Sequence, residues 1–293
     1  MKTYSAAVRD YAHTKLVKSG EHPPANCRLE FADVEPIHRA FAPMVRELRF
    51  DFAELALATY LQAWEAGKEL SLLPVVLHGN FHHGSIFRPA GSPIREPKDL
   101  AGKRVGVRSY TQTTGLWVRG ALAEDYGLDS DDVTWVTTEG PHVAEYAEPA
   151  NVERTSASLF ELLRAGEIAA LVIGPRALPA DAEVEPLLAD PKAAAQAWSR
   201  RHQAVPINHL LTVRTDVLRN DPDAVRGVYD AFAAEIDAQA TNAAGPPRIS
   251  HGLNPALLNS LRVGIQYAAR QHLISEVPSV DALFADFHRY LGK

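Results

Sequence analysis

The sequence predicts an α/β fold with two lobes. Short apolar runs typical of strands alternate along most of the chain with amphipathic runs typical of helices. This alternation favours layers of helix on largely parallel sheets. The chain has 293 residues, which is enough for two lobes that each bury a core of their own.

Composition narrows the possible partners. Hydrophobic residues make up 46% of the chain and charged residues 23%, as in ordinary globular proteins. The net charge is −6 and no basic tract appears, so nucleic acid is not an expected partner. Cys27 is the single cysteine, which excludes an internal disulfide and a zinc site built from several cysteines.

The N-terminal segment 1–16 has no apolar centre flanked by a small-residue cleavage site, so it does not resemble a secretory signal. No apolar run approaches the roughly 18 residues that suggest a membrane span. We therefore expect a cytoplasmic protein without a membrane span.

In the first third of the chain, strands and helices are expected in turn. Apolar and alternating runs predict strands at 6–8, 29–32, 50–57 and 72–77, and a helix that begins at Glu35. Pro36 suits the first turn of that helix. Pro74 weakens the strand at 72–77, because proline cannot donate to a ladder. The proline-rich segment 89–100 marks a boundary or a crossover.

The same alternation continues to the C-terminus. Apolar runs predict strands at 105–107, 133–137, 168–173 and 207–213, and a surface loop is expected at 139–155. Helices are expected at 116–127, at 222–236, at 255–268 and at 281–287, and part of 177–203 is also expected to be helical.

A polar turn between the strand at 105–107 and the next helix is the first candidate ligand site. Its hydrogen-bonding side chains include Arg108, Tyr110, Thr113 and Thr114. A helix N-terminus offers unpaired N–H groups to a carboxylate, and arginine can clamp one with two bonds. The alternative is that the threonines only cap the helix. Arg119 lies further along this helix and is expected to face solvent.

Histidines follow the apolar strand at 72–77, which is the ligand side of an open α/β sheet. His82 and His83 could donate a proton to a ring carbon. The alternative is that they bond backbone carbonyls near a hinge. His78, His82 and His83 lack a nearby carboxylate, so no metal site is expected.

Several stretches together resemble a known family. The segment 99–107 (DLAGKRVGV) is similar to the crossover of type 2 periplasmic-binding-protein folds. Further stretches are similar to the 4,5-dihydroxyphthalate decarboxylase family: Thr113, 117–120, 124–127, Trp135, the His83–Ser85–Ile86 stretch, 159–168, 206–209 and 252–254.

This resemblance implies a two-lobed fold with a central ligand cleft and two interlobe crossovers. Lobe I would hold residues 1–88 and 210–293, and lobe II residues 89–209. Four further residues are implied to bind the ligand: His13, Thr59, Asn208 and His209. The alternatives are surface exposure for His13 and a hinge-bracing role for Asn208 and His209. Glu54 could orient a histidine or pair with a basic partner.

The resemblance also implies an activity. The expected enzyme is a cofactor-independent decarboxylase of a hydroxylated aromatic dicarboxylic acid such as 4,5-dihydroxyphthalate. His83, with His82 beside it, would protonate the ring carbon, and Arg108 with the helix start would hold the second carboxylate. The alternatives are a solute-binding protein of an ABC-type uptake system or a sensor, and an enzyme acting on a different small acid. Neither a cofactor nor a metal is expected, and homo-oligomerisation stays open.

Overall fold

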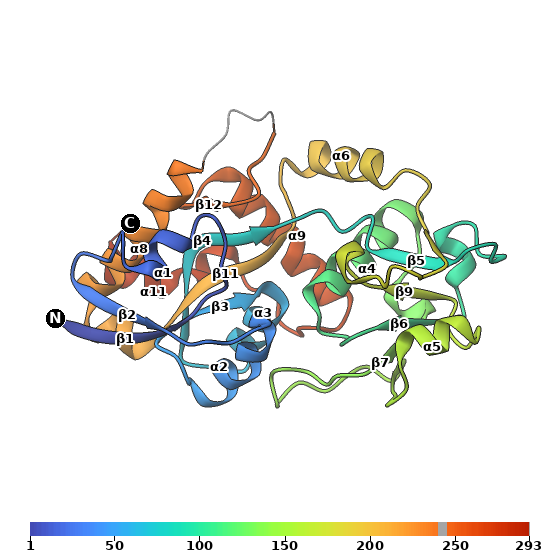
Figure 1. Ribbon diagram of the computed structural model, residues 1–293, viewed down its shortest axis with the longest axis horizontal. Helices are drawn as coiled ribbons and strands as arrows, with labels where there is room; N and C mark the ends of the chain where they lie inside the picture. Colours follow the sequence, from blue (N-terminus) through green and yellow to red (C-terminus); the bar gives the residue numbers. More distant parts are fainter. Residues whose placement is uncertain (240–244, 293) are drawn as a thin grey trace.

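The computed structural model describes residues 1–239 and 245–292. They form two six-stranded sheets that lie side by side with helices packed around them (Figure 1). The predicted two-lobed α/β fold is confirmed. Each sheet is mixed, however, because the strand next to each crossing runs antiparallel to its neighbours.

The first sheet has the order β12-β4-β11-β3-β1-β2. Its strands are β1 (Lys2–Ala7), β2 (Cys27–Phe31), β3 (Phe52–Ala56), β4 (Leu70–Gly79), β11 (Ile207–Arg214) and β12 (Ser250–His251). The predicted strand at 72–77 is confirmed as the centre of β4. Pro74 is tolerated there because the pairing of β4 with β11 shifts register between Leu72 and Val76.

The second sheet has the order β10-β5-β9-β6-β7-β8. Its strands are β5 (Ile86–Pro89), β6 (Arg104–Val107), β7 (Thr134–Thr137), β8 (Val152–Arg154), β9 (Ala170–Val172) and β10 (Val184–Pro186). Strands β6, β7, β8 and β9 run parallel, so the carboxyl ends of β6 and β7 meet at one edge.

Helices surround both sheets. They are α1 (Lys15–Ser19), α2 (Phe41–Glu47), α3 (Leu57–Glu65), α4 (Thr113–Tyr126), α5 (Leu159–Arg164), α6 (Pro191–His202), α7 (Thr215–Asn220), α8 (Pro222–Ala238), α9 (Pro255–Arg270), α10 (Val280–Leu283) and α11 (Ala285–Leu291). The helices predicted from residues 222 and 255 begin there as α8 and α9. The side chains of Asp221 and Asn254 cap them. No helix within the described ranges is long and apolar enough to cross a membrane.

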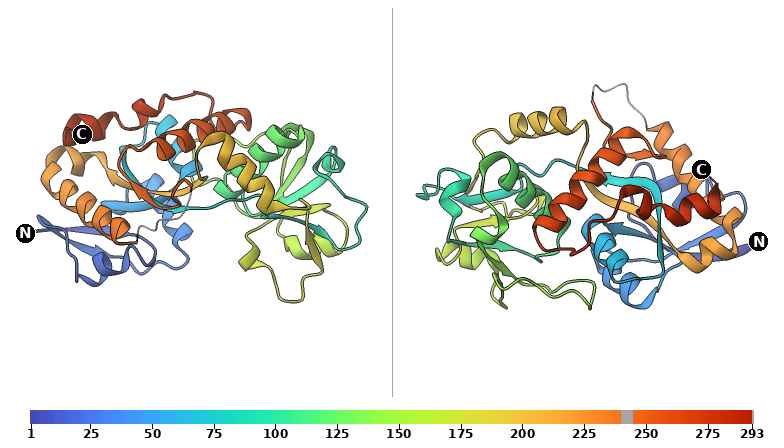
Figure 2. Two further views of the ribbon diagram at one scale, coloured as in Figure 1. Left: turned by 90° about the horizontal axis from the view of Figure 1, so that it is seen from above. Right: turned by 180° about the vertical axis from the view of Figure 1, so that it is seen from behind.

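The chain passes between the two sheets twice, from β4 to β5 and from β10 to β11 (Figure 1). The two crossings lie against each other, because the Asn80 N–H donates to the Pro206 carbonyl over 3.0 Å. The lobe bounds at residues 88 and 209 stay a proposal. Both termini lie at the end of the molecule away from the second sheet (Figure 2).

Helices α4 and α9 join the two lobes. A Cβ atom at Gly120 would lie 1.9 Å from the Tyr267 ring, so only glycine permits this close approach. Trp117 also reaches β11 of the first sheet, where its Nε1 donates to the Ile207 carbonyl over 2.8 Å. Almost every side chain of α4 from Gly115 to Ala123 is therefore buried.

Arg119 is a correction to the sequence analysis. It was expected to face solvent, but only 1% of it is exposed. Its Nε donates to Oε1 of Gln271 over 2.7 Å, its Nη2 donates to the Tyr110 carbonyl, and its guanidinium lies 4.1 Å from the centre of the Tyr110 ring. The expectation fails because α4 is enclosed by the second sheet and by α9, which leaves this face of the helix no contact with solvent.

Candidate functional site: an interlobe histidine cluster

Polar residues follow the carboxyl ends of β1, β3, β6 and β7, and the fold brings these four strand ends together. Thr59, just after β3, bonds His142, just after β7, through Oγ1 and Nδ1 at 2.8 Å. Ala58 N–H donates to Oγ1 of Thr113, which follows β6, over 3.2 Å. In open α/β sheets ligands bind outside the carboxyl ends of the strands, so this is the expected position of the site.

A buried carboxylate anchors the first-sheet side of the site. Glu54 on β3 has no exposed side-chain surface, and its Oε1 lies 2.5 Å from Nδ1 of His209 on β11. Tyr11 donates its hydroxyl to the same oxygen over 2.7 Å, and the Arg9 N–H donates to Oε2 over 2.9 Å. Glu54 thus contacts a histidine, His209, and its role in orienting that ring stays a prediction.

Aromatic stacking fixes two more histidines beside this pair. The rings of Tyr11 and His13 stack with centres 5.0 Å apart, and His78 stacks on Tyr11 with centres 5.9 Å apart. His13 is buried and bonds the Leu77 carbonyl through Nε2. The predicted surface alternative for His13 is therefore wrong, because Tyr11 and β4 enclose its ring.

The residues that follow strands of the second sheet add charged side chains to the site. Nη1 of Arg108 lies 2.6 Å from Oε2 of Glu139, and both side chains stay partly exposed. Phe41 packs edge-on against the rings of both His142 and His209. We name the whole group the interlobe histidine cluster: Arg9, Tyr11, His13, His38, Glu54, Thr59, His78, Arg108, Glu139, His142 and His209.

Most of these histidines are held neutral at pH 7. Burial lowers the pKa of His78 and of His142 to about 4, and the positive charge of Arg108 adds to the effect on His142. Burial also lowers the pKa of His13 and His38. Burial acts to raise the pKa of Glu54, but the bonds from His209, Tyr11 and the Arg9 N–H outweigh it, and the pKa lies below its usual value.

The start of α4 carries no side-chain cap within the described residues, and the residue before the helix is Gln112. The alternative that Thr113 and Thr114 only cap the helix is therefore wrong, because both lie inside its first turn. The first-turn N–H groups and the positive end of the helix dipole stay free to bind an anion.

Tyr110, predicted to bind the ligand, lies elsewhere. It has no exposed surface, and its hydroxyl donates to the Gln271 carbonyl over 2.8 Å. Its ring covers the guanidinium of Arg119. Tyr110 thus packs the contact between the lobes.

His82 and Asn208 meet at the two crossings. Nε2 of His82 lies 2.9 Å from Oδ1 of Asn208, and both side chains are buried. Burial lowers the pKa of His82 to about 4. The pair therefore braces the crossings, which is the alternative that the sequence left open for Asn208.

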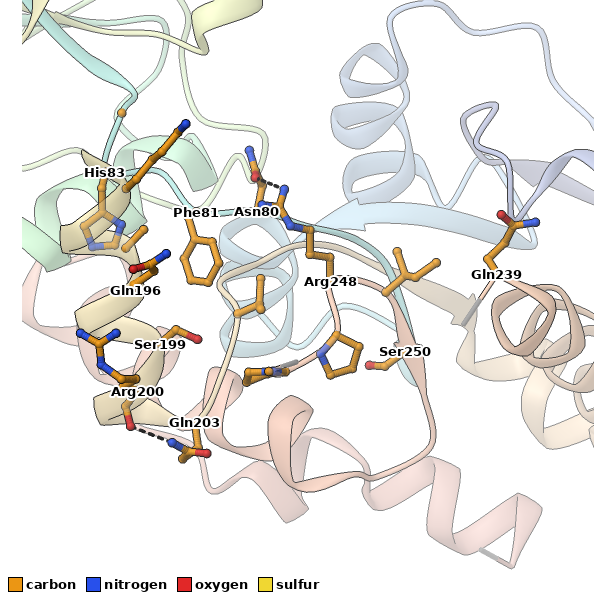
Figure 3. A pocket seen from close by; sticks show the side chains of 18 of the residues that line it. Asn80, Phe81, His83, Gln196, Ser199, Arg200, Gln203, Gln239, Arg248 and Ser250 are labelled. Carbon is orange, nitrogen blue, oxygen red and sulfur yellow. Dashed lines mark hydrogen bonds between the residues drawn. The ribbon is translucent and has the colours of Figure 1, made fainter. Parts of the chain in front are cut away.

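His83 points away from the cluster. It lines a separate cavity beside α6, together with Phe81, Gln196 and Ser199 (Figure 3). Besides burial, the charges of Asp125, Arg201 and Glu124 act on its pKa. The structure therefore does not bring His83 and Arg108 to one ligand.

Sequence reasoning missed Tyr11, His38 and His142. His142 lies five residues after β7, and Tyr11 four residues after β1. Both lie just beyond a predicted strand, which is the position that should have drawn attention. Across residues 1–239 and 245–292, no group of three or more His, Cys, Asp or Glu side chains is arranged to hold a metal ion.

Comparisons with known proteins agree with this architecture. Residues 33–180 match the model of a family described as ABC transporter, phosphonate, periplasmic substrate-binding protein. The alkanesulfonate-binding protein SsuA from Xanthomonas axonopodis pv. citri, bound to MOPS, superposes with a TM-score of 0.60 at 16% identity, covering 97% of this chain and 96% of that one. The desulfurization enzyme DSZB superposes with a TM-score of 0.60 at 17% identity, covering 100% and 99%. At such identities these likenesses show the fold alone.

The architecture and the polar residues between its lobes define a protein of the type 2 periplasmic-binding-protein-like class. Two curated relatives carry the name 4,5-dihydroxyphthalate decarboxylase. The one from Comamonas testosteroni is 34% identical over 218 residues, 68% of this chain and 63% of the relative. The one from Pseudomonas putida is 32% identical over 216 residues, 67% of this chain and 81% of the relative. The chain belongs to the 4,5-dihydroxyphthalate decarboxylase family, and its match spans just under two thirds of the length of the Comamonas relative.

Proposed function

We propose that this chain is a cofactor-independent decarboxylase of a hydroxylated aromatic dicarboxylic acid of the 4,5-dihydroxyphthalate kind. The observation that carries the proposal is the His209–Glu54 pair in the interlobe histidine cluster. A histidine held by a buried carboxylate is a suitable proton donor to carbon. The names of the curated relatives support the reaction class.

His209 is the proposed acid. Its Nδ1 is occupied by Glu54, and its Nε2 has no hydrogen-bond partner among the described residues, so Nε2 is free to face a ligand. Glu54 stays ionised and provides a counter-ion for an imidazolium at His209. The neighbouring rings of His78 and His142 are neutral, so they add no positive charge that would repel this imidazolium.

Two arginines on different lobes suit the two carboxylates of the substrate. Arg108 follows β6 beside the uncapped start of α4, and Arg9 follows β1 with its guanidinium 5.4 Å from the centre of the Tyr11 ring. Binding at Arg108 would replace its exposed contact with Glu139. A substrate held from both lobes would favour their closure.

The reaction balances without a further reactant. The protonated Nε2 of His209 donates its proton to the ring carbon that bears the leaving carboxylate. The bond from that carbon to the carboxylate then breaks, carbon dioxide leaves, and the electron pair restores the aromatic ring. His209 is left neutral and regains a proton from solvent. The ring hydroxyls supply the electron density that makes this carbon basic.

The test is to incubate the purified chain with 4,5-dihydroxyphthalate and to measure carbon dioxide and dihydroxybenzoate. We expect equimolar products with the unaltered chain, and at least a hundredfold slower formation with His209→Gln. We expect His83→Ala to keep turnover, because His83 lies in another cavity. Loss of turnover in His83→Ala with normal turnover in His209→Gln would show that His83, and not His209, protonates the ring carbon.

The alternative is a solute-binding protein that uses the same cluster without chemistry. Its support is the fold shared with the alkanesulfonate-binding protein. Saturable binding of a small organic acid, with no product from any aromatic dicarboxylate tested, would favour this alternative. The cytoplasmic location and the self-association state remain predictions from the sequence.

A further inference from the structure

A second space lies beside α6 and shares no described residue with the interlobe histidine cluster. Its volume is about 1250 Å³. One wall is α6 with His83 and Phe81 from the first crossing, and the opposite wall comes from the end of α8 and the segment before β12 (Figure 3). We name it the α6 cavity.

His83 is the unusual group in this cavity. Only 5% of it is exposed, and neither Nδ1 nor Nε2 has a hydrogen-bond partner among the described residues. Phe81 and Trp198 pack around its ring with centres 6.4 Å away. Burial lowers the pKa of His83, so the ring is a neutral donor and acceptor at pH 7. A buried polar group without a partner is uncommon in folded proteins, and here it leaves both ring nitrogens available to a ligand.

The rest of the lining indicates the ligand's chemistry. Phe81, Ala195 and Ile249 provide apolar surface. Among the lining residues that the structure describes, Lys192, Arg200 and Arg248 outnumber the one acid, Asp237. Arg248 is held in place by a 2.7 Å bond from its Nη1 to Oδ1 of Asn80, and it lies over the Phe81 ring. The combination favours an organic anion with an apolar ring and one hydrogen-bonding group.

We propose that the α6 cavity is a second small-molecule site, which takes an aromatic acid with a hydrogen-bonding group on His83 and its negative charge near the arginines. This site is separate from the proposed substrate site and does not depend on the decarboxylase proposal. By the proposed lobe bounds, the wall on α6 belongs to lobe II and the wall from α8 to β12 belongs to lobe I. A bound ligand would therefore contact both lobes.

The fluorescent aromatic sulfonate 1-anilinonaphthalene-8-sulfonate is a suitable probe. We expect a saturable rise in fluorescence with one site per chain. Gln196→Trp should weaken the affinity at least tenfold, because Gln196 lies beside His83 on the cavity wall (Figure 3). Ala197→Trp is the matched control, since Ala197 is the next residue of α6, is exposed, and does not line the cavity.

His83→Phe provides a second test that keeps the ring volume and removes both nitrogens. We expect a severalfold loss of probe affinity, while His209→Gln leaves the affinity unchanged. The proposal is overturned if the probe does not bind, if Gln196→Trp and Ala197→Trp bind it equally, or if His209→Gln alone abolishes binding. None of these results depends on turnover, so the decarboxylase proposal is tested separately.

Discussion

Nδ1 of His209 lies 2.5 Å from Oε1 of Glu54, across two neighbouring antiparallel strands. Leu211 is the residue directly opposite Glu54, so His209 reaches the carboxylate diagonally from two positions away. Positions two apart on a strand share a face, so His209 and Leu211 lie on the same face of the sheet as Glu54. The register of β11 against β3 therefore brings Glu54 and His209 into contact.

Glu54→Gln is expected to slow decarboxylation about tenfold to a hundredfold. The amide keeps the shape of the side chain but removes the charge that stabilises a protonated His209. The measurement is kcat with 4,5-dihydroxyphthalate, with KM as the internal control. A change in KM alone would contradict the orienting role.

The same variant should change how the free energy of unfolding depends on pH in the acid range. The pKa of Glu54 is lowered in the folded state, so its stabilising effect is present above about pH 4.5 and is lost as the pH falls through its folded pKa. Urea unfolding between pH 3 and pH 7 should show that Glu54→Gln loses less free energy of unfolding on acidification than the unaltered chain. An unchanged slope would mean that Glu54 is not ionised in the folded chain.

Arg108→Gln is expected to raise KM for the dicarboxylic acid by about tenfold, the size of one lost charge-assisted bond. Arg104→Gln is the matched control, because Arg104 also belongs to the β6 region but pairs with Glu153 at the surface. Steady-state kinetics with the substrate measure KM for both variants. Equal effects of the two substitutions would point to a general loss of positive charge.

His142→Gln is expected to make the protein less sensitive to acid. The folded-state pKa of His142 is about 4, against 6.5 for an exposed histidine, so the unfolded chain binds the extra proton between these values. Stability must therefore fall as the pH drops from about 6.5 to 4, by on the order of 3 kcal/mol for this residue. In urea unfolding, His142→Gln should no longer show this fall in the free energy of unfolding between about pH 6.5 and 4. The surface variant His272→Gln should still show it.

Arg119→Met is expected to destabilise the fold by about 2 to 4 kcal/mol, because it leaves Gln271 Oε1 and the buried Tyr110 carbonyl without their donor. Arg262→Met on exposed α9 surface is the control and should stay within about 0.5 kcal/mol. Urea denaturation measures both. A loss of less than 0.5 kcal/mol for Arg119→Met would show that the buried guanidinium contributes little.

Much of the fold can be predicted from local patterns. The apolar run at 72–77 became part of the internal strand β4, and the helices expected from 222 and 255 are α8 and α9, capped by Asp221 and Asn254. Local patterns failed for Arg119, because nothing in its neighbourhood indicates that α9 will cover that face of α4 more than a hundred residues later.

The sequence by itself determined the class of fold and the positions where polar residues follow strands, since hydrophobic periodicity and capping are local properties. Its motifs also indicated the family by resemblance. Only the tertiary structure decided which of those residues meet. Glu54 and His209 are 155 residues apart, and Thr59 and His142 are 83 apart. Their contacts depend on sheet register and on how the lobes close over the crossings. The same geometry separates His83 from Arg108, which lie on different sides of the crossings despite their nearness in sequence.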